Sequence, residues 1–155
     1  MIQMQSGVRL GPYQLESKLG TIWNAVQLPT IRAAIELQRG QPGKSVELLS
    51  SALPYEHAFP DAVYFRGLTY LSLNKGTEAA AEFQKIVDHK GATWGRSRFN
   101  RNGGLYHSIS SLGLARGYAL VGDTAKAREA YQNFFALWKD ADKDIPILIK
   151  PEFRS

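Results

Sequence analysis

A fixed spacing between small and bulky apolar residues constrains this chain more than any other feature of its sequence. Three pairs of such residues lie 34 positions apart: Ala33 and Gly67, Ser45 and Ala79, and Leu49 and Phe83. Four further pairs lie 48 positions apart: Gly67 and Ala115, Tyr70 and Tyr118, Ala79 and Ala127, and Phe83 and Tyr131. The excess of 14 residues (48 − 34) falls between Asp88 and Tyr106. The pattern therefore indicates one unit that occurs three times and is interrupted once.

Each unit has the pattern of two amphipathic helices around a short turn. Apolar residues recur at helical intervals in both halves of a unit, and Gly, Pro, Asn or Asp occupies the turn. Two antiparallel helices approach to about 8–10 Å only where one of them presents a small residue, which explains the small positions. We predict a helical domain over residues 22–140 with units at 27–57, 60–91 and 107–139, an insertion loop at 90–104, a poorly ordered tail at 1–21 and a capping segment or tail at 141–155.

Composition excludes several classes of function. The chain has 155 residues and no Cys, which excludes disulfides, Cys-based zinc sites, iron–sulfur clusters and a cysteine nucleophile. Its net charge of +5 tolerates an acidic partner but is too small to indicate nucleic acid by itself. No apolar stretch approaches the ~20 residues of a membrane span, and the first ten residues lack a signal-peptide core. We therefore expect a cytoplasmic protein without a membrane segment.

No group of residues in the sequence indicates catalysis or metal binding. We expect one histidine in each inter-helix region, namely His57, His89 and His107. No two of them have metal-ligand spacing on one helix. The serines near residue 110 lack the Gly-x-Ser-x-Gly motif that exposes a nucleophile. Carboxylates such as Glu78, Glu82 and Asp88 fall on faces expected to be solvated. We predict no enzyme activity, no cofactor and no bound metal.

The small and large positions at 34-residue spacing resemble the tetratricopeptide repeat. Residues 67–70 with 79–83, and 114–118 with 127–131, carry the resemblance. The first unit departs from the family pattern, with Glu36 in place of an aromatic residue and Ser45 in place of Ala, and the Pro that usually ends a unit is missing. The resemblance covers about residues 25–140. It implies an all-α solenoid of about three helical hairpins, a superhelix whose concave groove binds a peptide or protein segment.

A narrower resemblance is to the repeat region at the C-terminal end of bacterial eukaryotic-like serine/threonine kinases. It is carried by residues 28–34, 53–56, 81–86 and 138–142, and residues 6–20 resemble the lead-in to a kinase glycine-rich loop. The remaining loop glycines and the Val-Ala-x-Lys, His-Arg-Asp and Asp-Phe-Gly motifs are absent. This resemblance implies, as an alternative to a scaffold or adaptor, a regulatory kinase fragment that acts in trans. A chance match of residues 6–20 to an ordinary tail is the other interpretation.

The groove of such a repeat is lined by residues on the first helix of each unit. The positions that project from the small packing residues are Gln27, Thr30, Ala34, Gln38, Tyr64, Leu68, Leu71, Leu112, Arg116 and Ala119. Chaperone-binding members of the family hold a C-terminal carboxylate with Lys and Asn at these places, and this chain lacks that set. We predict a mixed aromatic and aliphatic groove for a protein or peptide partner. Packing between neighbouring units is the alternative for Tyr64 and Leu112.

The insertion interleaves basic and aromatic residues, namely Trp94, Arg96, Arg98, Phe99 and Arg101. Because arginine and aromatic residues are frequent at binding hot spots, we predict that this loop binds the partner at one edge of the groove. One alternative is a solvated loop whose Trp94 covers a helix pair. The least favoured alternative is weak binding of single-stranded nucleic acid through residues 94–101.

The ends of a helical stack expose apolar surface unless something covers them. Ile145, Ile147 and Leu148 follow the last predicted helix, and Pro146 interrupts any continuation of it. We predict homo-oligomers that form through these residues, or through Ile22, Trp23 and Val26 of another copy.

Overall fold

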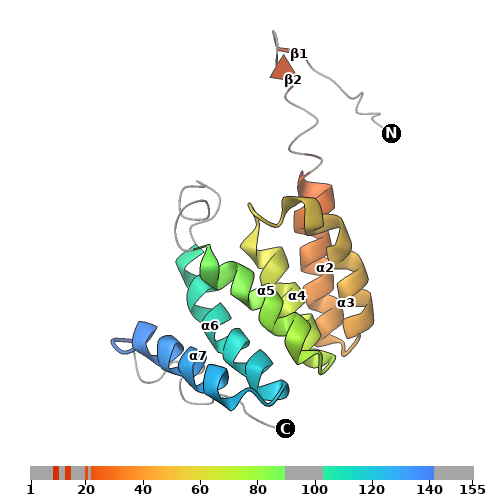
Figure 1. Cartoon of the computed structure of the whole chain (residues 1–155). Coiled ribbons are helices and arrows are strands. Elements are labelled where there is room, and N and C mark those ends of the chain that lie inside the picture. The colour runs from red at the N-terminus through yellow and green to blue at the C-terminus, as the bar shows by residue number, and fades with distance from the viewer. Residues whose placement is uncertain (1–8, 11–12, 15–19, 21, 90–102, 142–155) are drawn as a thin grey trace.

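The computed structural model describes residues 9–10, 13–14, 20, 22–89 and 103–141, and within them six α-helices pack in sequential pairs (Figure 1). The elements are β1 (Arg9–Leu10), β2 (Tyr13–Gln14), η1 (Trp23–Gln27), α2 (Leu28–Gln38), α3 (Pro42–Leu49), η2 (Ser50–Tyr55), α4 (Pro60–Ser72), α5 (Gly76–Asp88), α6 (Gly103–Leu120) and α7 (Thr124–Leu137). The two short strands pair antiparallel, Arg9 with Gln14 and Leu10 with Tyr13. The predicted all-α class is confirmed.

The three helical hairpins share one turn geometry. The first helix of each ends before a residue with positive φ: Gly40 (71°), Asn74 (56°) and Gly122 (79°). The next backbone N–H donates to a carbonyl five residues earlier: Gln41 to Glu36 at 2.9 Å, Lys75 to Tyr70 at 2.9 Å and Asp123 to Tyr118 at 3.0 Å. This arrangement satisfies carbonyls that the helix end leaves without partners. Both features recur at the 34- and 48-residue spacings, so the sequence repeat is also a repeat of backbone geometry.

The small positions lie where the helices cross, and all of them are buried: Ala33, Ser45, Gly67, Ala79, Ala115 and Ala127. The ring of Phe83 on α5 lies against glycines of α4 and α6. A Cβ atom added to Gly67 would lie 2.7 Å from Cζ of Phe83, and one added to Gly113 would lie 2.5 Å from the same atom. Two glycines on neighbouring units therefore leave room for one fully buried aromatic ring.

The departure at Ser45 has a structural explanation. Its hydroxyl is buried and forms a 2.8 Å hydrogen bond with the hydroxyl of Thr69 on α4. Thr69 in turn donates to the carbonyl of Phe65 at 2.8 Å. A serine in place of alanine is satisfied here because the next unit supplies its partner.

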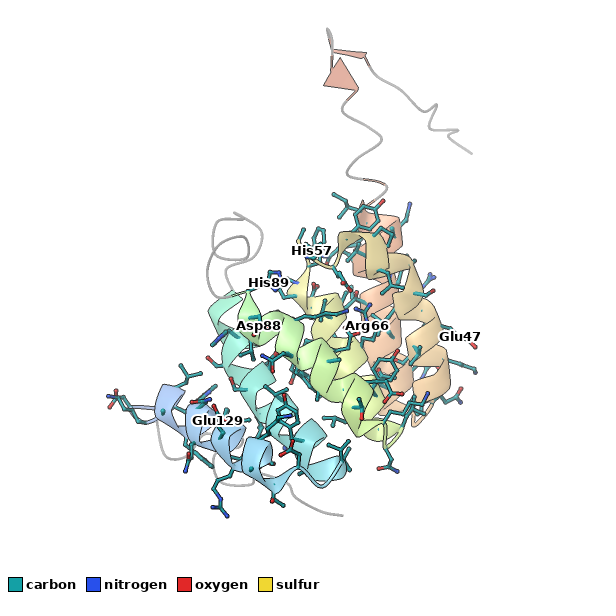
Figure 2. All side chains as sticks on the ribbon, viewed as in Figure 1. Glu47, His57, Arg66, Asp88, His89 and Glu129 are labelled. Carbon is teal, nitrogen blue, oxygen red and sulfur yellow. The ribbon has the colours of Figure 1, made fainter. Side chains whose placement is uncertain are left out.

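A charged cluster links the connection after η2 to α4 and α5. Arg66, whose side chain is 4% exposed, pairs with Glu56 and with Glu82. Lys85 lies 3.3 Å from both carboxylates. Because every charge in the cluster faces an opposite one, burial of Arg66 is tolerated. Figure 2 labels Arg66 in the middle of the molecule.

Several expectations differ from the structure. Glu82, expected on a solvated face, is 8% exposed and its carboxylate pairs with Arg66. α6 begins at Gly103, so residues 103–104 are helical rather than part of the loop. For the same reason, the prediction that His107 lies between helices was wrong. Val26 is fully buried in η1, so the prediction that it covers another copy was also wrong. The expectations for Trp94 and for Ile145, Ile147 and Leu148 lie outside the described residues. Among the described residues, no helix is long and apolar enough to cross a bilayer.

Candidate functional site

Two residues predicted to line the groove are buried in the structure, and the prediction is corrected for both. Thr30 is 4% exposed, and its hydroxyl donates to the carbonyl of Val26 at 2.7 Å. Leu112 is 2% exposed. Neither side chain presents surface to a partner, because each is packed inside the helix stack.

The predicted residues on α4 are half-buried and belong mainly to the packing. Leu68 and Leu71 contact the apolar cluster that contains Phe83. The ring of Tyr64 lies 5.7 Å from that of Phe83 and 5.5 Å from that of Tyr106. These ring contacts agree with the alternative stated for Tyr64, packing between neighbouring units.

The remaining described positions of the predicted groove keep some exposure. Gln38 is exposed and Gln27 is half-buried. Arg116, also half-buried, lies near tyrosines of α4 and α7. Burial raises the pKa of Tyr64, and it raises the pKa of Tyr131 to about 12, while the positive charge of Arg116 opposes both shifts. The five predicted loop residues, Trp94, Arg96, Arg98, Phe99 and Arg101, lie outside the described residues.

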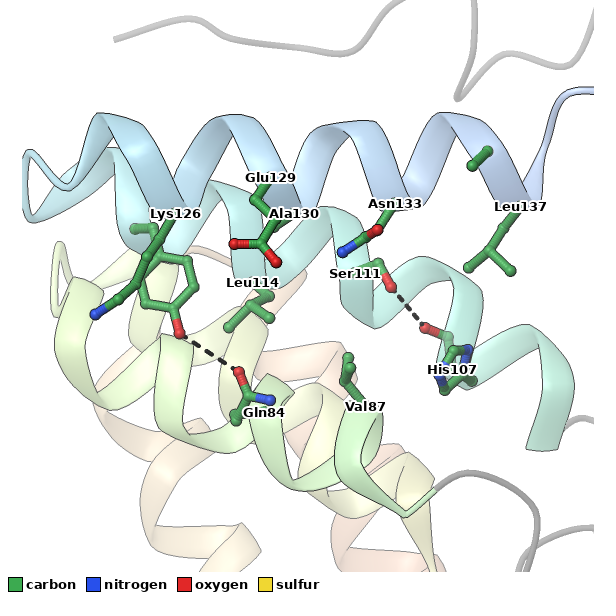
Figure 3. Close-up of a pocket in the computed structure, with 12 residues that line it drawn as sticks. Gln84, Val87, His107, Ser111, Leu114, Lys126, Glu129, Ala130, Asn133 and Leu137 are labelled. Atoms are coloured by element: carbon green, nitrogen blue, oxygen red, sulfur yellow. Dashed lines mark hydrogen bonds between the residues drawn. The ribbon is translucent and has the colours of Figure 1, made fainter.

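The structure contains a cavity that differs from the groove predicted on the first helices. A groove of about 530 Å³ runs between α5 and α7, and α6 forms its floor (Figure 3). Its lining comprises Gln84, Val87, His107, Ser111, Leu114, Tyr118, Lys126, Glu129, Ala130, Asn133, Ala136 and Leu137. The buried residues Leu114 and Ala130 make its inner surface apolar. We call this cavity the α5–α7 groove.

Several polar groups of the α5–α7 groove already have partners. The ammonium of Lys126 lies 3.2 Å from Oδ2 of Asp123 and 5.4 Å from the ring centroid of Tyr118. The hydroxyl of Tyr118 donates to Oε1 of Gln84 at 3.4 Å, and the hydroxyl of Ser111 donates to a backbone carbonyl at 3.3 Å. These bonds hold the two ends of the groove in place.

Glu129 and Asn133 differ from these groups. Both side chains are exposed and extend from α7 over the groove (Figure 3). Within the described part of the chain, neither has an ion-pair or hydrogen-bond partner. They stand one helical turn apart, so a carboxylate and an amide line the same wall. A ligand in the groove would meet both.

A second hollow of about 660 Å³ lies between α2 and α3, lined by Arg32, Ile35, Glu36, Arg39, Lys44, Glu47 and Leu48. Arg39 and Glu36 already form a 2.9 Å ion pair. Beyond this pair, the charged groups of its lining are Arg32, Lys44 and Glu47, which are of mixed sign.

Metal-binding clusters are absent from the described residues. No group of three or more His, Asp or Glu residues among them could hold a metal ion. His57 and His89 lie together at one end of the molecule, with ring centroids 5.8 Å apart (Figure 2). Nδ1 of His89 is 2.6 Å from the carbonyl of Lys85, which fixes its ring. Ser110 and Ser111 are buried and offer no exposed nucleophile.

Sequence reasoning missed the α5–α7 groove because its polar residues have the pattern of an ordinary solvated face. Glu129 and Asn133 lie between the apolar residues of α7 without a motif of their own. The available signal was their spacing of four residues beside the small positions Ala130 and Ala136, which keep that wall shallow. No family model, no curated protein and no solved structure matches this chain.

Proposed function

We propose that this chain is a non-catalytic protein-interaction module, built from tetratricopeptide-like helical hairpins, that binds a peptide or protein segment. The repeated turn geometry and the buried small positions support the repeat. The observation that carries the proposed function is the α5–α7 groove, whose apolar floor lies beside two polar side chains without described partners.

The dimensions of the groove suit this role. Ligand sites in proteins usually have volumes of about 300–1,000 Å³ and combine an apolar lining with a few polar groups. The α5–α7 groove has about 530 Å³ and extends along α7 from Lys126 to Leu137. This supports a ligand with a chain shape, such as an extended segment of another protein, and moves the proposed binding face away from the positions occupied by Thr30 and Leu112.

An unbiased peptide selection tests the proposal. Peptides selected from a random phage-displayed library on the immobilised full chain are synthesised, labelled and titrated by fluorescence anisotropy. Ala136→Arg fills the groove from an exposed position of α7, and we expect it to weaken binding about tenfold or more, which equals about 1.4 kcal/mol.

Ala81→Arg is the matched control, because Ala81 is exposed on α5 outside the groove lining. Circular dichroism and urea unfolding verify that both variants fold. A library that yields no binding peptide, or peptides that bind Ala136→Arg as well as the unchanged chain, would contradict the proposal.

A further inference from the structure

We propose that the α5–α7 groove selects a segment that carries a lysine or arginine next to a bulky aliphatic residue. This selectivity rests on the proposed function and adds to it the chemistry of the ligand. The charge that the groove leaves unmatched and the apolar surface beside it support this selectivity.

Two charged side chains, Lys126 and Glu129, border the groove. The positive charge of Lys126 is matched internally, by the carboxylate of Asp123 at 3.2 Å and by the ring of Tyr118. The negative charge of Glu129 has no such match among the described residues. The groove therefore offers a ligand one free charge, and that charge is negative. An arriving cation gains an ion pair with an unpaired carboxylate, whereas an arriving carboxylate meets an ammonium that Asp123 already neutralises.

An apolar surface lies next to the carboxylate of Glu129. Leu114 lies in the floor below Glu129, and Ala130 follows Glu129 on α7 (Figure 3). Val87 faces them from α5, and Leu137, which is 52% exposed, lies at the far end. A leucine or isoleucine of the ligand would cover this surface while its basic neighbour reaches Glu129. Burial of apolar area provides affinity, and the charge pair provides selectivity.

Asn133 adds a side-chain amide to the lining of the groove. Its amide carries both donors and an acceptor, and it stands one turn from Glu129 on the same wall of the groove. A peptide backbone that crosses the wall presents both kinds of partner. The amide would therefore hold the main chain of the segment, while Glu129 and the floor recognise its side chains.

Three fluorescein-labelled probes of ten residues test this selectivity on the full chain. They share Gly-Ser flanks and differ at the centre, which is Leu-Lys-Leu, Leu-Glu-Leu or Ser-Lys-Ser. We expect the Leu-Lys-Leu probe to bind best and its affinity to fall as salt rises. Binding of the Leu-Glu-Leu probe at equal strength, or no binding of the Leu-Lys-Leu probe up to about 1 mM, would overturn the proposal.

Charge variants at the groove give the second readout. We expect Glu129→Gln to weaken the Leu-Lys-Leu probe about fivefold and Glu129→Lys to prefer the Leu-Glu-Leu probe, since the free charge is then positive. Glu78→Gln is the matched control, because Glu78 is exposed on α5 outside the groove. An unchanged affinity in Glu129→Gln would overturn the selectivity.

The two proposals fail in different ways. If library peptides lose affinity for Ala136→Arg but their affinity does not change with the charge at position 129, the groove binds peptides and only the selectivity is wrong. If Ala136→Arg leaves every peptide bound, the proposed function is wrong as well.

Discussion

The guanidinium of Arg66 is almost fully buried, and two carboxylates from different parts of the chain hold it in place. Glu82 is on the facing helix α5, while Glu56 lies in the connection that follows η2. A buried cation that loses a partner is left poorly compensated, so each carboxylate stabilises the fold through Arg66. Burial opposes ionisation of Glu56, but its hydrogen bond with Arg66 and the charge of Lys85 outweigh that effect and lower the pKa of Glu56.

We predict that the stability lost on replacement of the Glu56 carboxylate depends on pH. Because the folded state lowers the pKa of Glu56, its contribution is complete above the unfolded pKa and is lost as pH falls through the folded pKa. We expect Glu56→Gln to lower the free energy of unfolding by about 1–2 kcal/mol at pH 7. The difference from the unchanged chain should shrink as pH falls below about 4.

Urea unfolding of both proteins from pH 7 to pH 3 measures this effect. Burial raises the pKa of Asp61, which acts in the opposite direction but is present in both proteins and cancels in the comparison. Glu47→Gln is the control, because Glu47 is exposed and has no ion pair among the described residues. A Glu56→Gln deficit that stays constant down to pH 3 would show that the ion pair is not its source.

At the scale of helices and turns, the same left-handed position ends the first helix of every unit. Glycine occupies it at Gly40 and Gly122, but Asn74 occupies it in the middle unit with φ of 56°. Glycine adopts this conformation without the steric cost that a Cβ atom brings. The middle turn is therefore the one whose sequence fits its backbone least well.

This difference predicts opposite effects for two substitutions. Asn74→Gly should raise the free energy of unfolding by about 0.5 kcal/mol, because it removes the side-chain strain at φ of 56°. Gly122→Ala should lower it by about 1 kcal/mol, because it adds that strain at an equivalent position. Thermal and urea unfolding of the two variants measure both changes, and a loss of stability in Asn74→Gly would refute the interpretation.

The elements were largely predictable from the sequence, whereas the candidate site was not. Turn residues such as Asn74 and Gly122 act within a few residues of themselves, so local patterns locate the ends of helices. The start of α6 at Gly103 was missed because two glycines signal a loop and only tertiary packing overrides that preference. The candidate role of Glu129 was missed because it depends on ion pairing in the folded chain. Lys126 pairs with Asp123, whereas Glu129 has no ion pair among the described residues, and local sequence does not show this difference.

The groove predicted on the first helices illustrates the same limit. The residues there were chosen for projecting away from the small positions, and a helix pattern gives that direction correctly within one unit. The pattern does not tell how far the next unit covers the same side. Leu112 is 2% exposed, although the pattern gives it an outward position on its own helix.

At the scale of the whole molecule, stability depends on how each helix pair contacts the next, because no pair buries its apolar face alone. The contacts between α4, α5 and α6 join the second pair to the third. Phe83 lies at their centre, between Gly67 and Gly113. Next to it, a Cβ atom on Gly76 would lie 2.7 Å from the carbonyl oxygen of Gly117, so the two backbones also touch. The phenyl ring of Phe83 is therefore one of the contacts that couple the second and third units.

Phe83→Ala should weaken that coupling as well as the core. Removal of a fully buried phenyl ring costs about 3–5 kcal/mol, and the glycines on either side have no side chains that could fill the space. Phe135→Ala is the matched control, since Phe135 is 47% exposed on α7 and its loss should cost less than about 1 kcal/mol.

Single-tryptophan variants that retain only Trp23 or only Trp138 report on the two ends of the helix stack during urea unfolding. In the unchanged chain and in Phe135→Ala the two transitions should coincide, whereas in Phe83→Ala they should separate, because the ends then unfold independently. Coincident transitions in Phe83→Ala would mean that other contacts between α5 and α6 carry the coupling.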